Sequence, residues 1–114
     1  MGNDNLSALV LELRRGTVVL CVLCKLRKPM YGYDLVSKLT EAGIPVEGNT
    51  LYPLLRRLES QGLLESRWDT AEAKPRKYYV TTDEGARVRG VLEKNWRELN
   101  ENMRKIIEEV YDDE

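Results

Sequence analysis

The sequence lacks histidine altogether, and only two of its 114 residues are cysteine. Without histidine the chain has lost the commonest general base, the commonest transition-metal ligand and the usual pH switch near neutrality. Cys21 and Cys24 lie inside an apolar run, and no second pair or neighbouring acidic cluster completes a metal site. The sequence also has no nucleophile motif and no phosphate-cradling glycine loop. We therefore expect no enzyme, metal or cofactor, and we interpret both cysteines as small buried core residues.

Long apolar runs are missing as well. No stretch is long enough to span a bilayer, and no basic leader followed by an apolar run and a small-residue cleavage site begins the sequence. We expect a cytoplasmic protein. A chain of 114 residues suits one fold with a real core and much exposed surface.

An excess of basic charge is also absent, because the formal net charge is −1. The charge is unevenly distributed, however. Residues 49–82 carry six basic and four acidic side chains, whereas residues 83–114 carry six basic and ten acidic ones. This asymmetry fits a nucleic-acid-binding face in the middle of the chain and an acidic, solvent-facing helix at its end.

The most informative stretch is residues 48–62. Four leucines at helical spacing predict a buried stripe, formed by Leu51, Leu54, Leu55 and Leu58. The side chains that face away from this stripe are those of Thr50, Tyr52, Arg56, Arg57 and Ser60. We expect Asn49 to be the N-cap, Pro53 to lie in the first turn and Gly62 to stop the helix. The pattern favours a recognition helix for DNA.

Two helices are predicted before this stretch. The first covers residues 6–26, with a bend or close backbone approach at Gly16 and a buried second half. Its end is predicted at Pro29. The second covers residues 31–41 and stops at Gly43, so that helix, turn and helix follow one another.

A change of period after Gly62 predicts two strands. Residues 64–68 alternate, and residues 77–81 are aromatic and β-branched, with a polar loop over residues 69–76. We expect an antiparallel hairpin, or wing. Because Tyr78 and Tyr79 alternate faces, one of them belongs to the core.

A long helix is predicted from the N-cap Thr82 to about residue 111. Its apolar residues repeat at intervals of four and three, as in the seam of a coiled coil; they are Leu92, Trp96, Leu99, Met103, Ile106 and Val110. The seam implies a partner helix, most simply one from a second subunit. We assign these residues, with Leu6 and Leu9 of the first helix, to a dimer interface.

Four motifs in order resemble the PadR family of transcriptional regulators over roughly residues 16–90. They are Tyr31-Gly32-Tyr33-Asp34-Leu35, the run from Thr50 to Glu59, Gly62-Leu63-Leu64 leading to Trp68, and Arg76-Lys77-Tyr78-Tyr79 ahead of Thr82 and Gly85. The length resembles the short subfamily. The resemblance implies a winged helix-turn-helix repressor that binds palindromic operator DNA as a homodimer.

These observations lead to one architecture: a mainly α fold with a small antiparallel β-hairpin, namely a winged helix-turn-helix and a long C-terminal dimerisation helix. We expect a DNA-binding domain over residues 1–82 and the dimerisation helix over residues 83–114. The candidate DNA-binding residues are Tyr33, Asn49, Thr50, Tyr52, Pro53, Arg56, Arg57, Lys74, Arg76 and Lys77. Tyr33 is included because it resembles a family phosphate contact, whereas the three wing cations have the alternative of a solvated hairpin tip.

Two alternatives remain open at this point. Trp96 is either simple interface packing or, by resemblance to the short subfamily, part of a pore that binds planar aromatic or cationic effectors. The whole chain is either a repressor released by such an effector or a ligand- or protein-binding helical adaptor whose winged helix is structural. The adaptor would show no salt-sensitive DNA binding.

Overall fold

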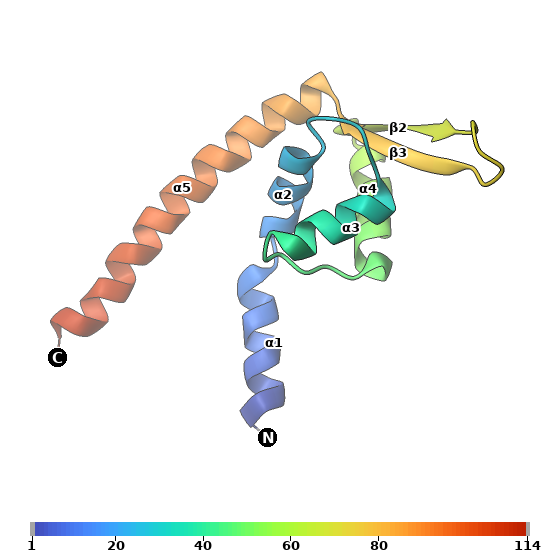
Figure 1. The fold of residues 1–114 in the computed structure, drawn as a ribbon. Helices are drawn as coiled ribbons and strands as arrows, with labels where there is room; N and C mark the ends of the chain where they lie inside the picture. Colours follow the sequence, from blue (N-terminus) through green and yellow to red (C-terminus); the bar gives the residue numbers. More distant parts are fainter. Residues whose placement is uncertain (1, 114) are drawn as a thin grey trace.

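The computed structural model describes the backbone of residues 2–113 and the side chains of residues 5–113. In chain order its elements are α1 (Gly2–Arg14), α2 (Thr17–Lys25), β1 (Met30–Tyr31), α3 (Gly32–Glu41), α4 (Gly48–Ser60), β2 (Leu64–Asp69), β3 (Arg76–Thr81) and α5 (Asp83–Asp112). Figure 1 shows a body formed by α2, α3, α4 and the sheet, from which α1 and α5 project. Met1 and Glu114, the outermost residues of the two expected domains, lie outside the described residues.

The leucine stripe of α4 is the centre of the core, as predicted. Leu51, Leu55 and Leu58 are buried and Leu54 packs partly against them. Their buried neighbours come from α2, α3 and the sheet: Val22, Leu23, Leu26, Leu35, Leu39, Leu64 and Tyr79. Since each fully buried leucine stabilises the fold by roughly 1.5–3 kcal/mol, these contacts fix α4 in place.

The start of α4 differs from the prediction. The N-cap is Glu47, in extended conformation, and its carbonyl accepts hydrogen bonds from the amides of Thr50 and Leu51 at 3.0 and 2.9 Å. The assignment of Asn49 as N-cap is therefore wrong, and Pro53 lies in the second turn rather than the first. The missing amide of Pro53 leaves the carbonyl of Asn49 without its helical partner, but Asn49 is exposed and water can replace that bond.

The break at Gly16 is confirmed, because Gly16 has a φ of +94° and separates α1 from α2. Only one side of α2 reaches the core, so Cys21 is half-buried and Cys24 is exposed. The interpretation of both cysteines as buried is therefore wrong for Cys24. Partial burial raises the pKa of the Cys21 thiol above its usual range.

The predicted hairpin is confirmed, and each strand is one residue longer than expected. A third strand, β1, was not predicted: its two residues pair with β3, giving an antiparallel sheet of order β1-β3-β2. Two residues are too few to show an alternating period, so only the tertiary pairing reveals this strand. Tyr79 is the buried member of the tyrosine pair.

The long helix α5 is confirmed, with the hydroxyl of Thr82 accepting a hydrogen bond from the amide of Gly85 at 3.0 Å. Leu92 is half-buried against the core of its own chain, because the first turns of α5 lie on α2. From Trp96 onward the seam is exposed. Among residues 2–113, no helix combines the length and hydropathy that a membrane span requires.

Candidate nucleic-acid interface

The outer face of α4 is exposed along its whole length. It presents Asn49, Thr50, Tyr52, Pro53, Arg56 and Arg57. Within the described part of the chain, neither arginine of this face forms an ion pair. The helix therefore displays two uncompensated guanidinium groups, which are suited to phosphate or base edges.

Tyr52 has a structural contact that the sequence pattern did not indicate. A Cβ atom added at Gly32 would lie 2.6 Å from Cε1 of Tyr52, and one added at Gly48 would lie 3.3 Å from Cε2. The ring thus rests on the glycines that begin α3 and α4, and the residue is only 36% exposed. The glycine of the Tyr31-Gly32-Tyr33 motif is explained by this close approach. Tyr52 is partly a packing residue and only partly displayed outward.

The same contact brings the start of α3 beside the first half of α4. Tyr33, the second residue of α3, is 76% exposed and is one residue from the glycine that Tyr52 touches. Tyr33 and the exposed residues of α4 therefore belong to neighbouring helix starts. The N-terminus of a helix carries the positive end of the helix dipole, so two neighbouring helix starts favour an anionic group near them.

The three predicted wing cations differ in their surroundings. Lys74 is exposed in the loop between β2 and β3. Arg76 pairs with Glu72 at 3.3 Å and stacks over Tyr31, with Cζ 4.8 Å from the ring centroid. Lys77 is 30% exposed and pairs with Glu59 of α4 at 3.7 Å.

Glu59 connects the wing to α4, because it also accepts a hydrogen bond from the hydroxyl of Ser66 at 2.5 Å. The ammonium of Lys77 lies 5.9 Å from the ring centre of Trp68, whose side chain is 63% exposed. These contacts give Lys77 a position-holding role in addition to its charge. Arg67, exposed on the opposite face of the wing, was omitted from the prediction, although strand alternation places it there.

A hydrogen bond at the loop end of the wing joins the short strand β1 to the hairpin. The hydroxyl of Tyr31 donates to Oδ2 of Asp69 at 2.5 Å, and the amide of Ala71 donates to Oδ1 at 3.0 Å. These two bonds hold the pKa of Asp69 below its ordinary value, and the bond to Asp69 raises the pKa of Tyr31. The loop end of the wing is therefore stabilised at pH values above the ordinary aspartate pKa, and this stabilisation is lost as the pH falls through the lowered pKa.

The predicted dimer residues lie on the two projecting helices. Leu6 and Leu9 are exposed on α1, and Trp96, Leu99, Met103, Ile106 and Val110 are exposed along one side of α5. Exposed apolar side chains in this number and at this spacing are typical of an interface rather than of a monomer surface.

A family model described as the transcriptional regulator PadR-like family matches residues 19–91. A transcriptional regulator from Mycobacterium tuberculosis is 35% identical over 78 residues, which cover 68% of this chain and 70% of the relative. The crystal structure of a PadR family transcriptional regulator from Eggerthella lenta superposes with a TM-score of 0.88 at 58% identity, covering 92% of this chain and 94% of the other.

A third similar structure is that of Bacillus subtilis PadR in complex with operator DNA. Its TM-score is 0.64 at 25% identity, and the match covers 68% of this chain and 46% of that protein. This chain therefore corresponds to less than half of the DNA-bound relative.

Replacing Tyr31 by phenylalanine removes the hydroxyl donor to Asp69, and we expect the pKa of Asp69 to rise towards its ordinary value. The Ala71 amide remains, so the rise is partial. Carboxyl NMR chemical shifts followed through an acid titration measure it. Tyr78→Phe is the matched control, because the Tyr78 ring lies edge-on to Tyr31 while the hydroxyl bonded to Asp69 is that of Tyr31. An unchanged Asp69 pKa in Tyr31→Phe would contradict the assigned role of the hydroxyl.

Proposed function

Because this chain belongs to the PadR-like family of transcriptional regulators, we propose that it is a cytoplasmic, homodimeric repressor. In this proposal it binds a palindromic operator and releases it when a small-molecule effector binds. The observation that carries the DNA-binding part is the exposed face of α4 beside the wing, with two arginines that form no ion pair among residues 5–113. The operator complex of the Bacillus subtilis relative supports the same mode of action.

In this mode α4 enters the major groove, and the wing approaches the flanking backbone or minor groove. Residues 1–82 form the DNA-binding domain. Asn49, Thr50 and Pro53 contact base edges or sugars near the helix start. Tyr33 and the hydroxyl of Tyr52 bind phosphate beside them.

The cations divide into two groups. Arg56, Arg57 and Lys74 form no ion pair with another described side chain and are available to phosphates, whereas Arg76 and Lys77 are already partly neutralised by Glu72 and Glu59. Phosphate contacts position the protein, and contacts to base edges give sequence specificity. We therefore assign most of the electrostatic affinity to the first group.

The dimer is proposed to form through residues 83–114, the segment that contains α5, and through α1. The exposed seam needs an apolar partner, and the exposed leucines of α1 supply one in a second copy. The charges at the end of α1 and at the end of α5 are also opposite in sign. Arg14 and Arg15 border a hollow of about 690 Å³ beside α1 and the turn before α4. The last turns of α5 carry Glu108, Glu109 and Asp112 and no basic side chain in the final turn.

Trp96 is the proposed effector residue. It is 45% exposed and is the first seam residue beyond the part of α5 that covers the body. In this proposal Trp96 lies near the two-fold axis, where a residue approaches its own symmetry mate, and two indole faces suit a planar aromatic cation. Binding that favours one separation of the two recognition helices by a few kcal/mol is enough to release DNA.

Arg56→Ala should weaken operator binding by about 1–3 kcal/mol. It should also reduce the magnitude of the slope of log affinity against log salt by about 1, the value expected for the loss of one phosphate contact. A DNA fragment selected by the wild-type protein from a random pool serves as the probe, in binding titrations over a salt series. Arg97→Ala on α5 is the matched control, because it removes the same charge from a position outside the proposed DNA-binding face and off the apolar seam of α5. Equal affinity and salt slope for both variants would contradict the role of α4, and a wild-type protein without salt-sensitive binding would favour an adaptor.

Leu99→Glu places a carboxylate in the middle of the α5 seam, and we expect dimers to dissociate at concentrations where the wild type remains dimeric. Sedimentation velocity measures the change. Lys94→Glu introduces the same carboxylate on the opposite side of α5 and should leave the dimer intact. A wild-type monomer, or a dimer unaffected by Leu99→Glu, would refute this interface.

Ethidium, a planar aromatic cation, is expected to quench the fluorescence of Trp96. In a Trp68→Phe background, where Trp96 is the single tryptophan, addition of the dye should lower the emission. In Trp96→Ala, the anisotropy of the dye should show binding weakened by at least tenfold. Equal dye anisotropy with and without Trp96 would exclude Trp96 from an effector site.

A further inference from the structure

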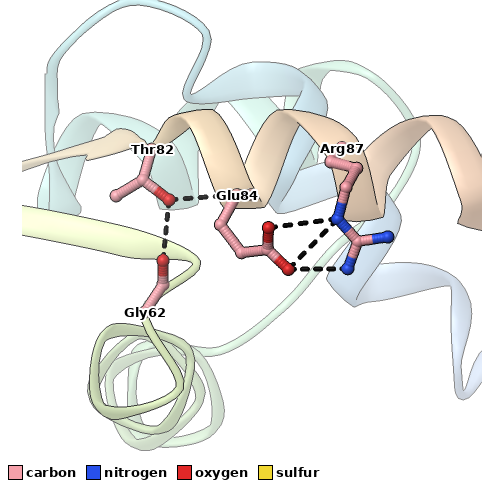
Figure 2. A network of polar contacts seen from close by, with 5 residues as sticks. Gly62, Thr82, Glu84 and Arg87 are labelled. Carbon is pink, nitrogen blue, oxygen red and sulfur yellow. Dashed lines mark hydrogen bonds and ion pairs between the residues drawn. The ribbon is translucent and has the colours of Figure 1, made fainter.

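The turn that follows the recognition helix α4 is hydrogen-bonded to the first turn of α5. Gly62, in the left-handed conformation with a φ of +78°, ends α4. Its carbonyl accepts a hydrogen bond from the hydroxyl of Thr82 at 2.7 Å, and the carbonyl of Leu63 accepts one from the Thr82 amide at 3.1 Å. Figure 2 shows the Thr82 side chain bridging the two segments. The end of one helix is therefore bonded directly to the cap of the other.

The hydroxyl of Thr82 both caps α5 and binds the turn after α4. Oγ1 of Thr82 accepts the amide hydrogen of Gly85, which caps α5, while it donates to Gly62. Removing that oxygen thus loosens the N-terminus of α5 and the turn after α4 together.

Gly85 brings the two segments into close backbone contact. A Cβ atom at this position would lie 2.1 Å from the carbonyl oxygen of Leu63 and 2.7 Å from Cγ2 of Thr81. The first distance is far below van der Waals contact, and its partner is backbone. Any residue larger than glycine must therefore move α5 away from the turn.

The start of α5 is also hydrogen-bonded to α2 and to the residue that follows it. The Thr81 amide donates to the carbonyl of Leu26 at 2.8 Å, and the Thr81 hydroxyl donates to the carbonyl of Leu23 at 3.1 Å. Arg89 donates to the same Leu23 carbonyl at 3.4 Å. The start of α5 is thus bonded to α2 as well as to the turn after α4.

The junction of the other projecting helix is different. At Gly16, between α1 and α2, no atom of the described part of the chain lies within 4 Å of the place of a Cβ, and the hydroxyl of Thr17 donates locally to the carbonyl of Arg14 at 2.7 Å. The α1 junction is open, whereas the α5 junction is closely packed and bonded to two elements of the body.

We propose that Thr82 and Gly85 are positioning residues that fix the angle between α4 and α5, and that this joint determines the spacing of operator half-sites that the dimer accepts. The inference rests on the proposed dimeric, operator-binding function. The 30 residues of α5 extend about 45 Å at 1.5 Å per residue. A change of about 5° in the angle between α4 and α5 therefore displaces the far end of α5 by about 4 Å. This displacement is similar to the rise of about 3.4 Å per base pair of DNA.

The first test compares Gly85→Ala with Gly90→Ala. The substitution is the same in the same helix, but a Cβ at Gly90 meets no atom within 4 Å. The probe is the operator fragment selected by the wild-type protein, resynthesised with its half-sites moved apart or together by one and two base pairs. We expect Gly85→Ala to bind the original spacing at least tenfold more weakly and to prefer an altered one, while Gly90→Ala keeps the wild-type preference.

A second pair of variants covers the case in which Gly85→Ala fails to fold. Thr82→Val removes the bridging hydroxyl and preserves the shape of the side chain, whereas Thr82→Ser keeps the hydroxyl. In Thr82→Val, operator affinity should depend less on the half-site spacing than in the wild type. Thr82→Ser should keep the wild-type dependence. Circular dichroism and sedimentation first establish that each variant is folded and dimeric.

The proposal is overturned if folded, dimeric Thr82→Val and Gly85→Ala keep the wild-type spacing preference. It is also overturned if each variant binds the full operator and a single half-site more weakly by the same factor, since that pattern indicates general damage to the DNA-binding domain. Residual dipolar couplings of α4 and α5 in the DNA-free protein report the interhelix angle independently. If the wild type binds no DNA, the proposed function fails, while a changed angle in Gly85→Ala but not in Gly90→Ala still supports the joint.

Discussion

Burial of the leucine face of α4 is the interaction on which the structure depends. Leu51, Leu55 and Leu58 are buried, and their neighbours come from α2, α3 and the sheet. A helix anchored by one face in this way has no freedom to rotate, so its opposite face is presented to solvent in a fixed orientation. The hydrophobic contact that stabilises the domain therefore also determines which side chains are available to DNA.

The charges around this helix are used in two different ways. Arg56 and Arg57 are unpaired within the described chain, while Lys77 is paired with Glu59 and holds the wing against the end of α4. A protein with a net charge of −1 can thus still present a locally basic surface. The acidic side chains that outweigh it are concentrated on α5, away from that surface, where several form ion pairs at helical spacing such as Arg97 with Glu93.

The projecting helices show that the body cannot bury all the apolar surface of the chain. Trp96 and Ile106 remain exposed on α5, as do the leucines of α1. The proposed dimer would cover this excess apolar surface with a second copy of the chain. The close contact of Gly85 with Leu63 would then make each α5 a rigid extension of its recognition helix. The geometry of the dimer would in that case determine the distance between the two recognition helices on DNA.

The sequence by itself determined the helix-turn-helix, the wing, the α5 seam and the outward-facing residues of α4, because each depends on a local period or on a local stop signal such as Gly43 or Gly62. Tertiary structure alone decided the N-cap at Glu47, the strand β1, the exposure of Cys24 and the placement of Leu92 on its own core. It also decided that Tyr52 rests on Gly32 and that Lys77 pairs with Glu59. These features depend on contacts between segments distant along the chain, and a local pattern of side chains carries no information about which distant surface will meet it.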